Sequence, residues 1–286
     1  MSSLTVIPNL TNIQQVECGY NHTMILLKDG SVKTCGRNNY GQLGLGDTTN
    51  RTSPTIIPNL TNVKQIACGT EHTIFLLKDG TVKVCGRNNN GQLGLGDTND
   101  RLTPTLIPNL DNIREIICGS YYSLFVLNDG TIKGCGYNRY DQLGLGSTVD
   151  IKTPTPLPLA NVNQILALNA SIIVLSNDGS LYSCGFNTQG TLGLGDTDSR
   201  NIFTEITSEK GNVRALAENI LGALVLFTIF YNNNEVVYNG NEITTILNHD
   251  IELVKSKAYN SFSNLLDSIA DKLLEKYKIL KYIIEE

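Results

Sequence analysis

The chain has 286 residues, of which 17% are charged and 41% hydrophobic, and its formal net charge is −5. This is enough sequence for one large folded domain with a small addition. Direct binding to nucleic acid is disfavoured, because it depends on clustered Lys and Arg facing phosphates and the sequence has no such cluster. The longest apolar run, from Ile220 to Tyr231, is shorter than the roughly 20 residues of a membrane span. Without a signal-peptide pattern after Met1, we expect a cytoplasmic protein.

The sequence repeats itself about every 50 residues. Cys18, Cys68 and Cys118 are equivalent, and so are Pro8 and Pro58 at the start of successive copies. A self-match at this period is typical of propellers and solenoids. We count four clear repeats and a degenerate fifth: 5–54, 55–104, 105–154, 155–204 and 205–246.

One repeat contains four short extended segments. In the second repeat these are Thr55 to Ile57, Val63 to Cys68, His72 to Lys78 and Thr81 to Cys85. Asp79-Gly80 stands between the last two, which predicts a β-hairpin with a two-residue primed turn. Four antiparallel strands per repeat form a propeller blade. The sequence therefore predicts an all-β fold, a β-propeller of about five four-stranded blades over residues 1–246.

Each clear repeat ends in a glycine-rich loop, G-Q-L-G-L-G-D at Gly41 to Asp47 and at Gly91 to Asp97. The glycines suit tight turns, and the two leucines can pack between blades. No helix follows the loop, so it lacks the helix N-terminus that would bind phosphate. The fifth repeat has no such loop.

Residues 247–286 have a different pattern. Their apolar side chains recur at steps of three and four residues, which predicts an amphipathic helix. The residues that form this pattern are Phe262, Leu266, Ile269, Leu273, Tyr277, Leu280 and Ile284. We expect the segment either to pack on the propeller or to pair with another helix. Self-association through this helix or through open blade edges is a further alternative.

The run from His22 to Asp47, H-T-x-x-x-L-x-D-G-x-V-x-x-C-G-x-N-x-x-G-Q-L-G-L-G-D, resembles the repeat of the regulator of chromosome condensation, as does the run from His72 to Asp97. The resemblance covers about residues 5–245. It implies a propeller, often of seven blades, that binds macromolecules through one face. Known members include a nucleotide-exchange factor for a small GTPase, ubiquitin-ligase subunits and a secreted β-lactamase inhibitor.

Two features depart from that family. Cys35, Cys85, Cys135 and Cys184 stand where the family usually has Trp, and the chain has no Trp. The repeat spacing also leaves no room for the wedge insertion that the exchange factor uses. With five repeats, the propeller could close with five blades, stay open, or be completed by a second chain.

The sequence offers no catalytic, cofactor-binding or metal-binding constellation. Equivalent cysteines lie a whole repeat apart, whereas a zinc site needs four converging ligands. The Asp of each Asp-Gly pair is explained by turn chemistry, and no nucleophile stands beside a base. We therefore expect a protein that is not an enzyme and needs no cofactor or metal.

Positions that vary between equivalent loops are the candidates for partner contact. One set of loops is 37–40, 87–90, 137–140 and 186–189, and the other is 20–22, 70–72 and 120–122. Arg and Tyr are enriched at interface hot spots. The predicted partner-contact residues are Arg37, Tyr40, His22, Arg87, His72, Tyr121, Tyr122, Tyr137, Arg139 and Tyr140.

These observations favour a non-catalytic interaction scaffold that binds a protein partner through a propeller face. An enzyme inhibitor or a propeller that binds a surface or glycan is the alternative. A small-GTPase exchange factor comes after both.

Overall fold

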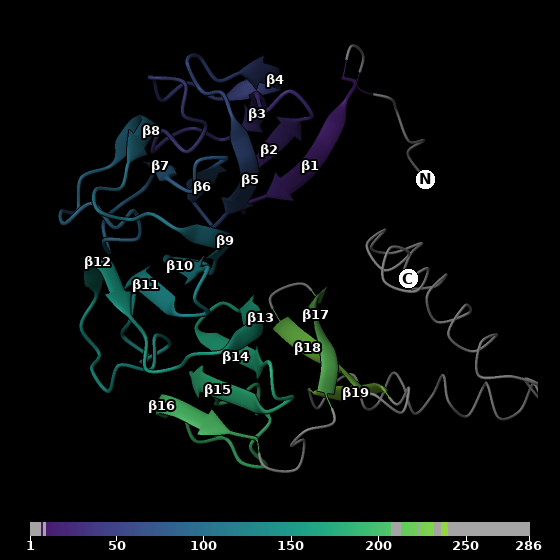
Figure 1. Ribbon diagram of the computed structural model, residues 1–286. Coiled ribbons are helices and arrows are strands. Elements are labelled where there is room, and N and C mark those ends of the chain that lie inside the picture. Colours follow the sequence, from purple (N-terminus) through teal and green to yellow (C-terminus); the bar gives the residue numbers. More distant parts are fainter. Residues whose placement is uncertain (1–6, 8–9, 207–212, 222–223, 232–235, 240–286) are drawn as a thin grey trace, which may run out of the picture. The chain divides into compact units, whose positions relative to one another are not determined.

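The fold is all-β in the part of the chain that the computed structural model describes. That part comprises residues 7, 10–206, 213–221, 224–231 and 236–239 (Figure 1). No helix within these residues is both long and apolar enough to cross a membrane. The predicted C-terminal helix and the predicted domain boundary at 246/247 lie outside the described residues.

Four four-stranded antiparallel sheets follow one another along the chain, and each pairs its strands in sequence order. The first contains β1 (Ile13–Cys18), β2 (His22–Leu27), β3 (Val32–Gly36) and β4 (Arg51–Ile56). The second contains β5 (Val63–Cys68), β6 (His72–Leu77), β7 (Val82–Gly86) and β8 (Arg101–Leu106). The third contains β9 (Ile113–Cys118), β10 (Tyr122–Leu127), β11 (Ile132–Gly136) and β12 (Ile151–Pro156). The fourth contains β13 (Val162–Ala167), β14 (Ser171–Ser176), β15 (Leu181–Gly185) and β16 (Arg200–Glu205).

A fifth sheet of three strands follows, with β17 (Val213–Leu221), β18 (Leu224–Tyr231) and β19 (Val236–Asn239). The predicted β-propeller class is confirmed, with one four-stranded sheet for each of the four clear repeats. The degenerate fifth repeat retains the first three strands of this pattern within the described residues.

The fourth strand of each sheet belongs to the following repeat when the repeats are counted from the sequence. The segment at Thr55 was assigned to the start of the second repeat. In the structure, Arg51–Ile56 pairs with β3 and closes the first sheet, with Thr34 opposite Thr55 and Lys33 opposite Ile56. Periodicity alone could not settle this, because any 50-residue frame matches itself equally well.

The Asp-Gly hairpins are present, but the predicted two-residue primed turn is wrong. Only the glycine has a positive φ, +84° at Gly30, whereas a primed type I turn needs it at both central residues. The Gly30 N–H donates to the Leu27 carbonyl at 2.9 Å, and the Leu27 N–H donates to the Ser31 carbonyl at 2.9 Å. This is a three-residue loop that ends in a left-handed glycine. Asp29 stabilises it by accepting from the Ser31 N–H and hydroxyl at 2.9 and 2.6 Å.

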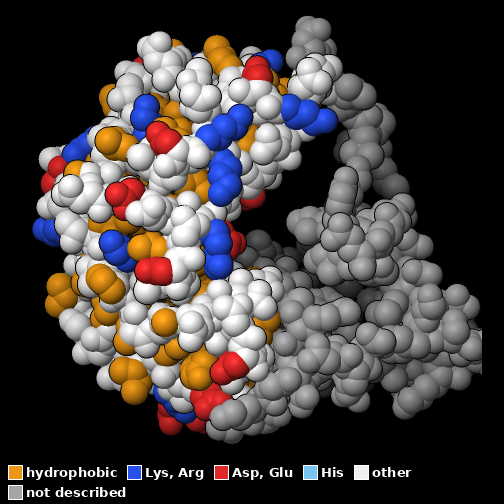
Figure 2. Space-filling view, in the orientation of Figure 1, with side chains coloured by type: hydrophobic (Ala, Val, Ile, Leu, Met, Phe, Trp, Pro, Cys, Tyr) orange, Lys and Arg blue, Asp and Glu red, His pale blue; other side chains and the backbone are white. Residues whose placement is uncertain are grey.

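The hydrophobic core lies between consecutive sheets, whereas the face of these sheets seen in Figure 2 carries Lys, Arg, Asp and Glu side chains beside hydrophobic ones. Met24 and Leu26 of β2 share one buried cluster with Ile66, Phe75 and Cys85 of the next sheet. Equivalent clusters join the second sheet to the third and the third to the fourth. Each of the first three sheets therefore depends on its successor to bury one of its faces, as expected for a repeat protein. We call each such sheet-to-sheet interface a seam.

Glutamine side chains reinforce the first two seams at the innermost strands. The Gln15 side-chain amide accepts from the Ile66 N–H and donates to the Ile66 carbonyl, both at 3.0 Å. Gln65 binds Ile116 in the same way, with both distances 3.1 Å. One amide thus satisfies both free backbone groups of the next innermost strand, groups that would otherwise be costly to bury.

The glycine-rich loop closes the outer part of each seam. Gly44 has a φ of +70°, and a Cβ there would lie 3.3 Å from the Cys85 Sγ of the next repeat. The Cys85 thiol in turn contacts the Gln42 carbonyl at 3.5 Å. The cysteine that replaces the family's Trp is therefore a small side chain packed beneath the preceding repeat's loop.

The first sheet has no preceding repeat among the described residues, and its β1 side is correspondingly exposed. Val16 is 50% exposed, whereas its counterpart Ile66 is fully buried. Ile13 is likewise exposed while its counterpart Val63 is buried. Identical places in the repeat therefore make different contributions to stability.

Truncating Ile66 and Val16 to alanine should lower the free energy of unfolding by unequal amounts. Ile66→Ala should lower the free energy of unfolding by about 3 kcal/mol, because it opens a cavity in a closed seam. Val16→Ala should change it by less than about 0.5 kcal/mol. Urea titration measures both values, and similar losses for the two variants would contradict the assignment of the seams.

Candidate partner-binding face

The two sets of variable loops lie together at one end of the sheets. Strand pairing places Gly36 opposite His22, so the loops that precede β2 and follow β3 emerge side by side. The Arg37 N–H donates to the Asn21 carbonyl at 2.8 Å, and Tyr137 binds Tyr121 equivalently at 2.9 Å. We call this end the loop face. The Asp-Gly hairpins, which join β2 to β3 and its counterparts, lie at the opposite end.

An asparagine that is the same in all four repeats supports each loop from its buried side. Asn38 is buried, donates to the Asp47 carbonyl at 2.8 Å and accepts from the Leu43 N–H at 2.9 Å. Asn88, Asn138 and Asn187 are buried equivalents that each accept from the corresponding leucine. The constant asparagine is therefore part of the scaffold, and the variable residues around it are free to differ.

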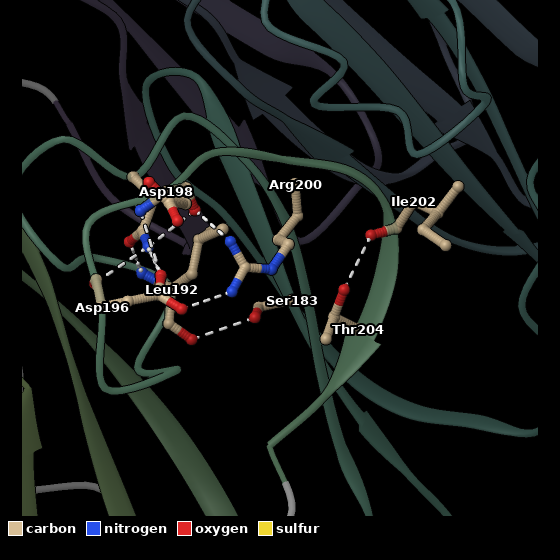
Figure 3. Close-up of polar contacts among 8 residues, drawn as sticks. Ser183, Leu192, Asp196, Asp198, Arg200, Ile202 and Thr204 are labelled. Atoms are coloured by element: carbon tan, nitrogen blue, oxygen red, sulfur yellow. Dashed lines mark hydrogen bonds and ion pairs between the residues drawn. The ribbon is translucent and has the colours of Figure 1, made fainter.

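An ion pair fixes the far end of the same loop in three of the four repeats. Figure 3 shows it in the fourth, where the Arg200 guanidinium bonds the Asp196 carboxylate at 2.5 Å and the Asp198 carbonyl at 2.6 Å. Ser183 donates to the Leu192 carbonyl at 2.9 Å nearby. Arg51 and Arg101 make the corresponding pairs with Asp47 and Asp97. The arginine hydrogen bond lowers the pKa of each of these aspartates.

The first cluster on the loop face combines two arginines, one carboxylate and one tyrosine. The Glu71 carboxylate lies 2.5 Å from the Arg87 guanidinium and 3.4 Å from that of Arg37. Both guanidiniums lie over the Tyr40 ring, at 4.8 Å for Arg87 and 5.8 Å for Arg37. Two cations thus share one buried anion, and the cluster keeps a net positive charge on a chain that is acidic overall.

The second cluster is mainly aromatic. The Tyr140 ring lies 5.9 Å from Tyr137 and 4.8 Å from Phe186, measured between centroids. Arg139 lies 5.9 Å from the Tyr137 ring and 3.9 Å from the Asp150 carboxylate. Tyr140 is 45% exposed, and the Arg139 side chain is 68% exposed. Burial raises the pKa of Tyr137, so its phenol stays neutral.

Contacts on the loop face cross from one repeat to the next. Tyr40 meets Arg87 across the first seam, and Tyr140 meets Phe186 across the third. At the second seam, the Asn90 amide donates to Asp150 at 2.9 Å. The variable side chains therefore form a connected surface whose shape depends on how the sheets are joined.

The predicted residues divide into two groups. Arg37, Tyr40, Arg87, Tyr121, Tyr137, Arg139 and Tyr140 lie on the loop face and are partly or well exposed. Glu71, Asp150 and Phe186 complete the clusters but were not among the predicted contact residues. The pairing of one acid with arginines a repeat apart is the signal that could have found Glu71.

His22, His72 and Tyr122 are buried, so their assignment as partner-contact residues is corrected. The His72 Nε2 lies 3.1 Å from the Ser123 hydroxyl, which itself donates to the Gln92 carbonyl at 2.6 Å. Because that hydroxyl proton is used, Nε2 carries the imidazole proton and donates. The Tyr122 phenol donates instead to the carbonyls of Leu168 and Ser171, both at 2.9 Å. All three side chains connect one repeat to the next.

Metal-ligating side chains do not converge anywhere in the described residues, which hold no group of three or more His, Cys, Asp or Glu placed to bind a metal ion. The seven cysteines, all within those residues, are free thiols. Burial raises the pKa of Cys85, Cys135 and Cys184, which keeps these thiols protonated and unreactive. Their part in the structure is packing.

Comparison with known proteins gives one family. The model described as RCC1-like domain matches residues 2–225. A 40-residue stretch, 14% of this chain and 1% of the relative, is 48% identical to the E3 ubiquitin-protein ligase MYCBP2 of Danio rerio.

Solved structures show the same fold. Human WBSCR16 has a TM-score of 0.66 at 23% identity, covering 80% of this chain and 61% of that one. Yeast RCC1 (Prp20) bound to Kap60 has a TM-score of 0.68 at 22% identity, covering 86% and 59%. Prp20p from Saccharomyces cerevisiae has a TM-score of 0.64 at 26% identity, covering 70% and 52%. The chain thus spans about half to three fifths of these structures.

The two buried histidines predict an acid-sensitive fold. Burial lowers the pKa of His22 to about 4 and of His72 to about 3, whereas an unfolded histidine titrates near pH 6.5. Their contribution to stability is complete above about pH 6.5 and is lost as the pH falls towards those lower values. His72→Ala should therefore be less stable at pH 7 by about 2 kcal/mol. Between pH 6.5 and 4, its unfolding free energy should depend less steeply on pH than that of the unaltered chain.

Urea titrations of both proteins at several pH values measure this difference. Thr61→Ala, a change at an exposed position whose side chain does not titrate, serves as the control with an unaltered histidine contribution. Equal slopes for the His72→Ala variant and the unaltered chain would contradict the assignment of a neutral, buried His72.

Proposed function

Because the chain belongs to the RCC1-like domain family, we propose that it is a non-catalytic interaction module that binds a protein partner through its loop face. The observation that carries the proposal is the surface of Arg and Tyr side chains, whose contacts cross the first and third seams and which buried groups common to all repeats support from below. Aromatic and arginine side chains on a rigid scaffold are typical of interface hot spots.

The known behaviour of similar structures supports a protein as the partner. Prp20p is described with its binding to Gsp1p and histones, and yeast RCC1 (Prp20) with Kap60 bound. All of these partners are proteins. The chain spans only part of these relatives, so their particular partners are not transferred to it.

The chemistry of the face suggests what such a partner presents. Arg37 pairs with Glu71 at the longer distance of 3.4 Å, and its side chain is 36% exposed. Arg139 is exposed and only loosely paired with Asp150. Carboxylates on the partner would bind these arginines, and its apolar side chains would pack on the exposed Tyr140 ring.

Affinity capture from native lysate tests the proposal, with variants chosen to compare the two ends of the sheets. Arg139→Ala and Tyr140→Ala should each weaken capture of the partner by about tenfold, since exposed arginine and tyrosine anchors dominate such interfaces. Lys78→Ala, which removes a positive charge from an exposed hairpin at the opposite end, is the matched control and should bind normally.

Two outcomes would contradict the proposal. Loss of binding with Lys78→Ala and not with the loop-face variants would place the interface at the hairpin end. Chemical change of the partner, or release of a nucleotide from it, caused by substoichiometric amounts of the chain would contradict a non-catalytic role.

A further inference from the structure

The third seam differs from the first two at one repeated position on the innermost strands. Gln15, Gln65 and Glu115 occupy the same place, each just after a bulge and opposite Leu26, Leu76 and Val126 respectively. The strands that carry them, β1, β5 and β9, are each followed by the innermost strand of the next sheet. Ile66 and Ile116, which Gln15 and Gln65 bind, occupy the same register position as Ile165 in the fourth sheet.

The first two seams show what this position does. A glutamine amide carries both a donor and an acceptor, so it binds the N–H and the carbonyl of one residue at once. An ionised carboxylate has acceptors only. It cannot donate to the Ile165 carbonyl, and its repulsion from that carbonyl keeps it away from the Ile165 N–H on the same strand edge. In the described part of the chain, no hydrogen bond joins Glu115 to Ile165, whereas both preceding glutamines bind their targets.

A protonated carboxyl group has the same donor and acceptor pattern as the amide. We propose that Glu115 is a proton-dependent clamp: when neutral it donates its O–H to the Ile165 carbonyl and accepts from the Ile165 N–H, and when ionised it releases the third seam. Only a proton is gained or lost in this step.

The surroundings of Glu115 favour its neutral form. Burial raises its pKa, and the adjacent Arg114 guanidinium offsets part of that rise. Arg114 itself donates to the Val162 carbonyl at 3.1 Å, and Lys64 of β5 donates to the Arg114 carbonyl at 3.3 Å. Val162–Ala167 of β13 contains no titratable side chain, and Tyr122 is the only titratable residue of β10.

The upward shift in the pKa of Glu115 determines how its contribution to stability changes with pH. Since folding raises the pKa of Glu115, its neutral form stabilises the fold below the unfolded pKa, and this contribution is lost as the pH rises through the folded pKa. The pH dependence is therefore opposite to that of the two buried histidines, which destabilise the fold as the pH falls.

The clamp also bears on the loop face, because the contact between Tyr140 and Phe186 crosses the same seam. Release of the clamp should loosen the second cluster and weaken partner binding as the pH rises. This consequence rests on the proposed function, whereas the clamp itself does not.

Amide hydrogen exchange of the full chain between pH 4 and 8 tests the clamp without any partner. Each protection factor is taken relative to the intrinsic exchange rate at the same pH. In the unaltered chain, protection of the Ile165 amide should fall about fivefold across the titration of Glu115, as expected for the loss of a hydrogen bond. In Glu115→Gln, which restores the residue of the first two seams, protection should be high and independent of pH.

Gln65→Glu provides a matched variant at the second seam. It should transfer the pH dependence to the Ile116 amide, while the Ile66 amide, held by Gln15, stays unchanged as an internal control. The proposal is overturned if Ile165 shows the same pH profile in the unaltered chain and in Glu115→Gln. It is also overturned if Gln65→Glu leaves Ile116 independent of pH. Failure of the loop-face variants to alter partner capture would leave both exchange results unaffected, so the two proposals fail separately.

Discussion

A hydroxyl group held between two groups of the preceding repeat is the interaction on which the first two seams and the loops above them depend. The Thr73 hydroxyl donates to the Gln42 carbonyl at 2.9 Å and lies 3.1 Å from the His22 Nε2. Ser123 is held in the same way at the next seam. Buried polar groups must find partners, so this arrangement fixes the loop that carries Gln42. The same loop also carries Arg37 and Tyr40. The seam beneath the loop therefore sets the shape of the loop face.

Much of the fold could be predicted because each repeat contains its own local signals for strands and turns. Asp-Gly between two apolar runs predicts a hairpin, and the constant spacing of Cys18, Cys68 and Cys118 predicts equal sheets. The turn type escaped prediction because Asp29 stabilises its loop by accepting hydrogen bonds, without itself adopting a positive φ. The difference between Val16 and Ile66 also escaped, since exposure depends on having a neighbouring repeat, which a local pattern does not encode.

The loop face was predicted in part, on the premise that positions varying between repeats are free to contact a partner. Arg139 and Tyr140 are exposed, as the premise requires. It fails for His72 and Tyr122, which differ from each other and are both buried. The larger Tyr122 is accommodated because its phenol reaches the Leu168 and Ser171 carbonyls of the following repeat. Variation at a seam can thus be compensated by a changed partner in the next repeat, which a comparison of single positions does not detect.

The claim that the loop face is the binding surface is tested most directly by amide hydrogen exchange of the chain with and without its captured partner. We expect the partner to slow exchange in residues 37–40, 87–90 and 137–140, while the hairpins at 28–31 and 78–81 exchange as in the free chain. Protection of those hairpins, with the three loops unchanged, would contradict it.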